Sequence, residues 1–141
     1  MSARGALIAH LDTIPAALRG SSFPTMSKTL GPYSPFVRAG DFIIVSGQGG
    51  MLDGVIVEGG VGAQTVQTMA NLADRLADAG AELSDVVKTM CFLTDMGTFG
   101  EFNDAYAAAF GDHRPARSTV EVAALPGGMN VEVEAWAYKP A

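Results

Sequence analysis

Apolar and polar residues alternate along two stretches near the C-terminus, residues 119–124 and residues 130–138. Successive side chains of a β-strand point to opposite faces, so this alternation predicts two strands that each have one apolar face. The segment between them, residues 125–129, reads Leu-Pro-Gly-Gly-Met and would end a strand. The pattern therefore predicts a β-hairpin, and it places Glu132 and Glu134 together on one face of the second strand.

Arg117 stands just before the first stretch and has the same parity as Thr119 and Glu121, so the three should share a face. In the simplest register of the predicted hairpin, Glu132 lies opposite Val122. Arg117 is then about 15 Å from Glu132, at about 3.3 Å per residue. A site that uses both side chains therefore needs the edge of another subunit, or a different register.

Shorter patterns predict the other elements. Two short strands are expected over residues 36–38 and 41–46, the second with an apolar run, Phe42 to Val45, that should be buried on both faces. A third strand is expected over residues 86–93. Helical spacing predicts two helices. The first helix covers residues 61–79, ends before Gly80 and has an apolar stripe of Val66, Met69, Leu72, Ala73 and Leu76. The second covers residues 99–110, begins after the N-cap candidate Thr98 and has an aromatic stripe of Phe99, Phe102, Tyr106 and Phe110. Gln64 is assigned to the polar face of the first helix.

The order of these elements, β-β-α-β-α-β-β, predicts an α+β fold: a mixed β-sheet with two helices packed on one face. The other face of the sheet still carries Val, Ala, Trp and Tyr side chains. In a chain this small, such a face is expected to be buried against other copies of the chain. The first thirty residues have no clear pattern, so we expect an N-terminal extension over 1–30 and one domain over 31–141.

Composition narrows the classes of function. With 141 residues, 48% of them hydrophobic and 17% charged, the chain suits one globular domain. A net charge of −6 and scattered basic residues argue against a nucleic-acid binder or a binder of anionic membranes. No apolar run approaches the roughly 20 residues that cross a bilayer. We therefore expect a cytoplasmic protein that associates with neither nucleic acid nor membrane.

The residues that often carry chemistry are few. Cys91 is the single cysteine and lies in an apolar run, so a buried thiol is favoured over a catalytic thiolate. His10 and His113 form no ligand-like group with it, and no metal site is expected. Ser46 and Gly47 begin a glycine-rich exit from a buried strand, which either brings a ligand close to the backbone or makes a tight turn.

Several short motifs together resemble the RidA (YjgF) family. They cover the chain from Gly31 to the C-terminus and are Gly31-Pro32-Tyr33-Ser34, Ser46-Gly47-Gln48, Phe99 with Asn103 and Tyr106, Pro115-Ala116-Arg117-Ser118, residues 120–126 and residues 131–135. The resemblance implies a chorismate-mutase-like fold and a homotrimer whose sheets form a central barrel. It also implies active sites between subunits and deamination of 2-imino acids and enamines.

The resemblance also implies roles for single residues. Arg117 is similar to the arginine that grips the substrate carboxylate, and Glu132 to the carboxylate that orients water. Tyr33, Ser46, Gly47 and Asn103 are similar to residues of the substrate pocket, and Thr119 stands at a pocket position where many members have cysteine. Structural roles stay open beside these: Arg117 could form an ion pair with Glu121 or with Glu132 of a neighbour, Glu132 could be a solvated carboxylate, and Asn103 could bond backbone.

The chemistry fits these side chains. A planar guanidinium binds a carboxylate with two charge-assisted hydrogen bonds, and a buried carboxylate of raised pKa helps to add water and expel ammonia. A C=N bond is already reactive, so neither a metal nor an organic cofactor is expected. The expected partner is a small imine or enamine that carries a carboxylate.

Departures from the family pattern leave other functions open. Gly49-Gly50 replaces an apolar residue and proline, which predicts a looser loop beside the pocket. Thr119 excludes thiol chemistry at its position. A pathway-specific deaminase of an enamine such as 2-aminomuconate or aminoacrylate is one alternative. RNA cleavage with translation inhibition and a non-catalytic, chaperone-like trimer are alternatives of other classes.

Overall fold

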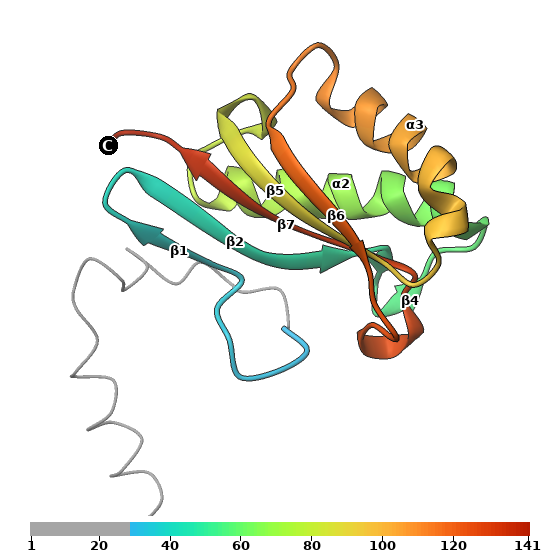
Figure 1. Cartoon of the computed structure of the whole chain (residues 1–141). Coiled ribbons are helices and arrows are strands. Elements are labelled where there is room, and N and C mark those ends of the chain that lie inside the picture. Colours follow the sequence, from blue (N-terminus) through green and yellow to red (C-terminus); the bar gives the residue numbers. More distant parts are fainter. Residues whose placement is uncertain (1–28) are drawn as a thin grey trace, which may run out of the picture.

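A computed structural model describes residues 29–141 of the chain (Figure 1). Its strands and helices are β1 (Phe36–Ala39), β2 (Phe42–Gly49), β3 (Met51–Leu52), β4 (Val55–Ile56), α2 (Gly60–Asp78), β5 (Val86–Leu93), α3 (Phe99–Phe110), β6 (Ala116–Glu121) and β7 (Val131–Tyr138). Most of the predicted extension, residues 1–28, lies outside the described part, so the division of the chain at residue 30 stays a prediction.

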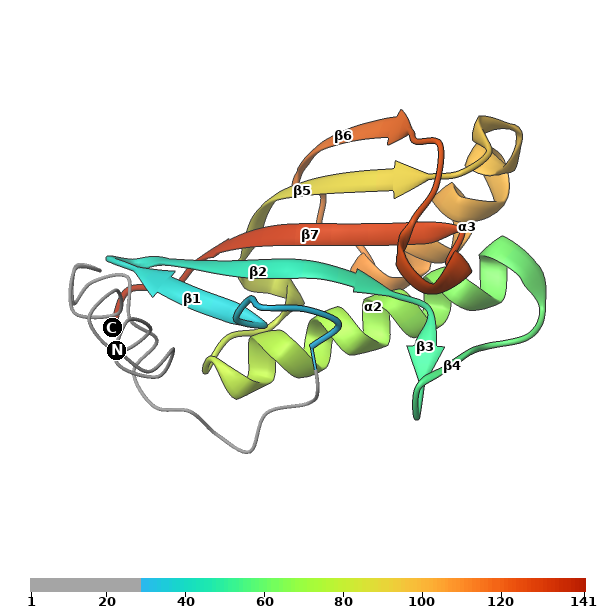
Figure 2. The same ribbon diagram turned by 90° about the horizontal axis from the view of Figure 1, so that it is seen from below.

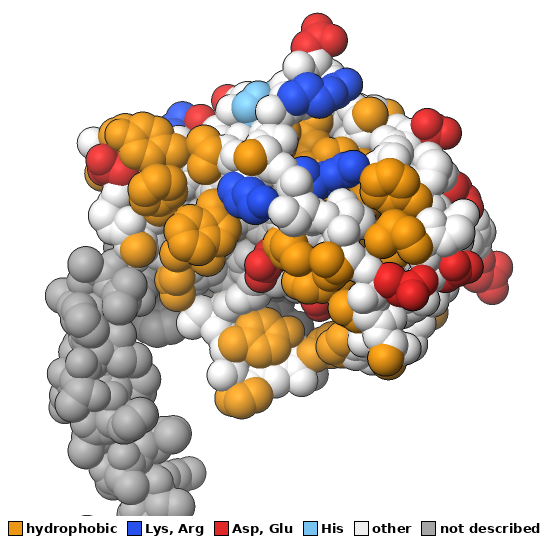
Figure 3. Space-filling model, in the orientation of Figure 1, with side chains coloured by type: hydrophobic (Ala, Val, Ile, Leu, Met, Phe, Trp, Pro, Cys, Tyr) orange, Lys and Arg blue, Asp and Glu red, His pale blue; other side chains and the backbone are white. Residues whose placement is uncertain are grey.

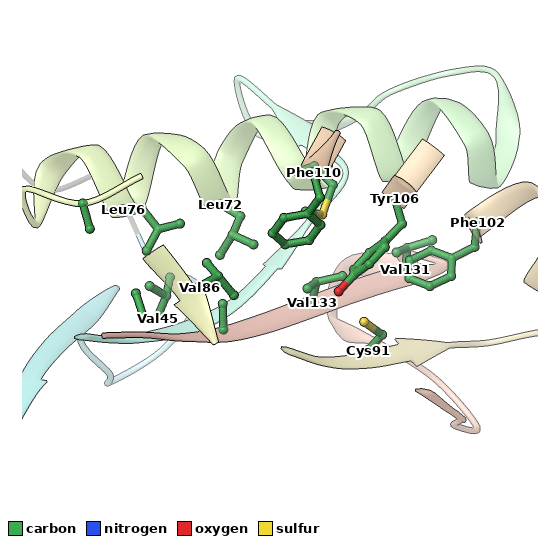
Figure 4. Close-up of a cluster of buried hydrophobic side chains, with 14 of the residues drawn as sticks. Val45, Leu72, Leu76, Val86, Cys91, Phe102, Tyr106, Phe110, Val131 and Val133 are labelled. Carbon is green, nitrogen blue, oxygen red and sulfur yellow. The ribbon is translucent and has the colours of Figure 1, made fainter. Parts of the chain in front are cut away.

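The main sheet has five strands in the order β1-β2-β7-β5-β6, which can be followed in Figure 2. Only β5 and β6 are parallel; the other neighbours are antiparallel. Helices α2 and α3 pack on one face of this sheet, as Figure 4 shows for α2. The predicted mixed sheet with two helices on one face is therefore confirmed, and the small β3–β4 hairpin is an addition that the sequence patterns did not predict.

The predicted hairpin between residues 119–124 and 130–138 is wrong, because β5 lies between β6 and β7. Helix α3 connects β5 to the parallel strand β6, as parallel neighbours require a long crossover. The chain then reverses through Pro126–Gly128 and passes β5 before it enters β7. Turn residues show that a chain reverses, but they do not specify which strand it pairs with. The register that set Glu132 opposite Val122 is wrong for the same reason.

The core lies between the sheet and the helices (Figure 4). β7 is the central strand, and every second residue of it is fully buried. The aromatic stripe of α3 is confirmed for Phe102, Tyr106 and Phe110. Two assignments on α2 are wrong: Val66 is 61% exposed, whereas Gln64 is buried and accepts a hydrogen bond from the Asn130 N–H.

Two further local predictions have mixed outcomes. Strand β2 is not buried on both faces, because Ile43 and Val45 are buried under the helices while Phe42 is exposed on the other face. Its antiparallel neighbours make it an alternating strand rather than the continuous apolar strand of a parallel sheet.

Cys91 is fully buried as predicted, and burial raises the pKa of its thiol to about 11.

The face of the sheet opposite the helices is open in the single chain. Strands cross in front of α2 in the view of Figure 1, and the same view in Figure 3 shows hydrophobic side chains gathered in patches on this side. Exposed apolar side chains of the open face include Phe42, Val120, Trp136 and Tyr138. Such a face is unusual for a monomer and supports the expectation that other copies cover it, although the homotrimer stays a prediction.

Candidate active site

Arg117 extends from the edge strand β6 toward helix α3. Its guanidinium carbon lies 4.8 Å from the ring centre of Tyr106, 5.5 Å from that of Phe99 and 5.6 Å from that of Phe102. Distances below about 6 Å to a ring face are typical of cation–π contacts. Among residues 29–141, Arg117 forms neither a hydrogen bond nor an ion pair, so its N–H donors have no protein partner there.

Two more predicted pocket residues belong to the same elements. Asn103 lies on α3 among the three rings, and Thr119 follows Arg117 on the same face of β6. The Asn103 Oδ1 and Thr119 Oγ1 atoms are buried and have no hydrogen-bond partner in the described structure. Buried polar atoms are nearly always paired, so these two oxygens are candidates for hydrogen bonds to a bound molecule.

Glu132 lies on the central strand β7 and alternates with residues that are buried under the helices, so it points to the open face. Burial raises the pKa of its carboxyl group, and the negative charge of Glu134 raises it further. A Cβ atom at Gly47 would stand 2.6 Å from the Glu132 Cδ atom. Only glycine at position 47 therefore leaves the carboxylate in its place beside β2.

Tyr33, Gly47 and Glu132 line one hollow of about 170 Å³. These three are among the residues that the sequence interpretation assigned to the substrate site, and their role there stays a prediction. The sequence interpretation missed the apolar part of the lining, which includes Leu30, Met51, Pro126 and Met129. The residue in the sequence that could have indicated this wall is Gly49, because a Cβ atom there would lie 2.0 Å from the Met129 Sδ atom.

The expectation of a loose loop at Gly49-Gly50 does not fit the structure. The Asn71 side chain donates hydrogen bonds to the carbonyl oxygens of Gly49 and Met51, at 2.8 and 2.9 Å. A Cβ atom at Gly50 would lie 2.7 Å from the Gln64 Cα atom. The two glycines therefore let helix α2 and Met129 approach the backbone closely, and the loop is tied down.

Ser46 has a structural contact rather than a place in the lining of the hollow. Its hydroxyl donates a hydrogen bond to the Ser34 carbonyl oxygen at 2.7 Å, and its N–H donates to the Pro35 carbonyl oxygen at 3.0 Å. These bonds hold the segment that carries Tyr33 against β2. The Tyr33 hydroxyl in turn accepts a hydrogen bond from the Leu30 N–H.

One chain does not bring Arg117 and Glu132 together. Arg117 pairs with Thr89 of β5, Thr89 pairs with Ala135 of β7, and Glu132 is three residues from Ala135. Two strand spacings and three residues along the strand give about 14 Å between Cα atoms. The two side chains also point to opposite faces of the sheet. The chain therefore carries two separate half-sites, an arginine half-site (Arg117, Asn103, Thr119) and a glutamate half-site (Glu132, Gly47, Tyr33).

No three His, Cys, Asp or Glu side chains of residues 29–141 are grouped so that they could hold a metal ion. The same part of the chain contains no helix with the length and apolar character that a membrane span needs.

Comparison with known proteins agrees with this fold. The family model described as Endoribonuclease L-PSP matches residues 25–139. A mouse protein named 2-iminobutanoate/2-iminopropanoate deaminase is 43% identical over 112 residues, which are 78% of this chain and 83% of the mouse protein. Among solved structures, a Thermotoga maritima protein described as a putative endoribonuclease has a TM-score of 0.79 at 40% identity, covering 87% of this chain and 98% of its own. RidA from an Antarctic Psychrobacter has a TM-score of 0.74 at 35% identity, covering 86% and 98%. The chain belongs to the RidA family, which is also known as YjgF/YER057c/UK114.

Proposed function

We propose that the protein is a cofactor-independent deaminase that hydrolyses reactive 2-imino acids and enamines to 2-oxo acids and ammonia. The observation that carries the proposal is the pair of half-sites in a chain of the RidA family. One half-site holds a cation that has no hydrogen bond or ion pair among residues 29–141, and the other holds a carboxylate of raised pKa. The mouse relative, named 2-iminobutanoate/2-iminopropanoate deaminase, supports the same activity.

The active site is completed between subunits of a homotrimer. Each chain has both half-sites, and they are too far apart on opposite faces of the sheet to act on one small molecule. Packing of the open face against a second copy would bury its exposed aromatic side chains. We infer that the edge strand β6 of one copy, which carries the arginine half-site, then lies beside the glutamate half-site of another. In this arrangement the unpaired Arg117 donors, Asn103 Oδ1 and Thr119 Oγ1 gain a ligand.

The reaction divides the work between the two half-sites. Arg117 binds the substrate carboxylate through a bidentate pair of hydrogen bonds, which fixes the adjacent C=N carbon. Glu132 accepts a proton from water as the water oxygen bonds to the carbon of the protonated imine (C=NH2+), and a neutral carbinolamine forms. The proton passes from Glu132 to the amine nitrogen, the C–N bond breaks to release ammonia, and the hydroxyl proton returns to the Glu132 carboxylate as C=O forms. An enamine first takes a proton at carbon and becomes the same protonated imine.

The lining of the glutamate half-site supports one class of substrate. Its hollow of about 170 Å³ is lined in part by apolar residues such as Met51 and Met129. This space suits the short apolar side chain of an imine derived from alanine or a four-carbon amino acid. A longer dicarboxylic enamine would need a second cation, and the lining residue Arg75 already forms an ion pair with Asp78.

The test of this proposal is the change Arg117→Ala, with Arg114→Ala as the matched control. Imines are generated from amino acids by an amino-acid oxidase, and ammonia release is compared with the rate in buffer. Two lost hydrogen bonds to a charged group, at about 1.5–3 kcal/mol each, predict a fall in kcat/KM of about 10² to 10⁴-fold. Arg114 is exposed and bonds only the carbonyl oxygens of Gly111 and His113, so its change should be neutral. Turnover by Arg117→Ala at the unmutated rate would refute the mechanism.

A mixing experiment tests the inter-subunit site directly. Arg117→Ala and Glu132→Gln chains are unfolded together and refolded as mixed assemblies. If each site takes its arginine and its glutamate from different subunits, about a quarter of the sites in a random mixture contain both intact residues, and activity returns. Activity that stays at the level of the separate variants would mean that both residues act from one chain. Light scattering during gel filtration gives the number of subunits.

RNA cleavage is a second candidate, because the description of the matching family model names an endoribonuclease. The His113 ring contacts the Val86 carbonyl oxygen at 2.6 Å, so this histidine is occupied by the fold. We expect ribonuclease activity to disappear when the protein is washed with high salt during purification. Ribonuclease activity that persists and falls in parallel with deaminase activity in Arg117→Ala would favour the RNA function.

A further inference from the structure

The position of Arg117 depends on aromatic rings rather than on a carboxylate. A half-buried cation in a protein is usually paired with an anion, because burial of an unpaired charge is unfavourable. Here the ring faces of Tyr106, Phe99 and Phe102 carry that role, with Tyr106 closest at 4.8 Å. A ring face attracts the cation without taking up its N–H groups. All five donors of the guanidinium therefore stay available for a ligand.

Tyr106 is itself held by the neighbouring strand. Its hydroxyl forms a buried hydrogen bond with Thr89 Oγ1 at 2.7 Å, and Thr89 is fully buried on β5. Thr89 is the register partner of Arg117 in the parallel β5–β6 pair. Figure 4 shows the Tyr106 ring reaching from α3 to the sheet with its hydroxyl oxygen at the sheet end. Thr89 thus fixes the Tyr106 hydroxyl, while its neighbour on β6, Arg117, lies over the Tyr106 ring.

We propose that Tyr106, fixed by Thr89, is a positioning residue that holds the Arg117 guanidinium ready for the substrate carboxylate. The inference rests on the proposed function and deepens it. Phe99 and Phe102 supply further ring surface, but neither has a hydroxyl through which the sheet could set its orientation. Through the bond to Thr89 on β5, Tyr106 is therefore held in an orientation that positions the Arg117 side chain of β6.

The expected kinetic signature follows from populations. Without the Tyr106 ring, the arginine side chain turns among several rotamers, and only a fraction of the molecules has it in the binding position. The apparent affinity falls by that fraction, whereas substrate that is bound still reacts as before. If about a tenth of the molecules stay competent, KM rises about tenfold and kcat changes little. A change that only loosened the core would lower stability without this selective rise in KM.

The experiment compares three variants by steady-state kinetics on 2-iminopropanoate generated in situ, with thermal unfolding measured in parallel. Tyr106→Leu removes the ring and should raise KM about tenfold with kcat within about twofold. Tyr106→Phe keeps the ring but loses the bond to Thr89, so its KM should lie between those of Tyr106→Leu and the unmutated protein. Phe110→Leu is the control, because Phe110 is similarly buried and its ring centre lies 4.9 Å from that of Tyr106, in a tilted arrangement, but its ring is not among the three that contact the Arg117 guanidinium. It should lower the unfolding temperature and leave KM unchanged.

The outcomes separate this inference from the proposed function. If Arg117→Ala loses activity but Tyr106→Leu, like Phe110→Leu, has the KM of the unmutated protein, the positioning role of Tyr106 is wrong and the deaminase proposal stands. If Arg117→Ala itself retains full activity, the proposed function fails first. Should Tyr106→Leu not fold, the decision rests on Tyr106→Phe, whose KM equal to that of the unmutated protein would overturn the role of the Thr89 bond.

Discussion

Arg117 and Glu132 belong to the same sheet but to different surroundings. Arg117 lies on the edge strand β6, where aromatic faces stabilise its charge and leave its donors free. Glu132 lies on the central strand β7, where burial and the charge of Glu134 both disfavour its ionised form. The first environment suits a group that binds an anion and keeps its charge. The second suits a group that can still take up a proton at a pH where an exposed carboxylate does not.

The two half-sites also differ in how their side chains are held in place. The arginine is a long side chain that depends on rings for its direction, whereas the carboxylate has a short reach and is placed by β2 through the missing side chain of Gly47. Aromatic side chains therefore position the arginine, whereas the absence of a side chain at Gly47 leaves room for the glutamate. Changes to the glutamate half-site should therefore affect the chemical step more than binding.

The largest effect is expected for Glu132→Gln. The amide keeps the size of the side chain but accepts no proton, so kcat should fall by about 10² to 10⁴-fold, with a smaller change in KM. A carboxyl of raised pKa favours folding below its ordinary pKa and loses this contribution as the pH rises through the raised pKa. At pH 7 the amide should therefore be as stable as the carboxylate or slightly more stable, by well under about 1 kcal/mol. A variant with normal kcat would remove Glu132 from the reaction.

Gly47→Ala should have the next largest effect. The new methyl group would meet the Glu132 carboxyl carbon at 2.6 Å, so the carboxylate must move. A shift of about 1 Å at a catalytic group costs roughly 10²-fold in kcat. Gly100→Ala is the control, because nothing lies within 4 Å of a Cβ atom there and the position is helical. It should retain activity and gain up to about 1 kcal/mol in stability. Equal activity in both variants would contradict the close packing of Gly47 on Glu132.

The smallest effect is expected for Glu134→Gln, which acts through charge alone. With ionised Glu132 as the base, kcat falls as the pH drops through the raised pKa of Glu132. Removing the charge of Glu134 lowers that pKa, so the acid limb of the pH profile should move to lower pH. Burial, the larger cause of the shift, remains, and the plateau at higher pH should not change. A limb that stays in place, or moves upward, would show that another group sets it.

Much of the secondary structure could be predicted because its causes are local. The limits of β5 and α3, the aromatic stripe on α3 and the end of α2 before Gly80 all follow from side-chain periodicity and a helix-ending glycine. Gln64 and Val66 were misassigned because the polarity of residues in a sequence cannot show that the partly buried Asn130 N–H, 66 residues away, is bonded by a buried glutamine. The Met129 wall of the hollow was missed because its partner Gly49 is 80 residues away in the chain.

The sequence by itself determined which residue types are present for the chemistry and which face of its strand each occupies, because alternation along a strand is a property of neighbouring residues. Only the tertiary structure decided that β5 separates β6 from β7, since strand order depends on contacts between distant segments. It also decided that Arg117 lies against aromatic rings while Glu132 is half-buried and feels the charge of Glu134. Charge environments of this kind arise from packing in three dimensions, and no local pattern specifies them.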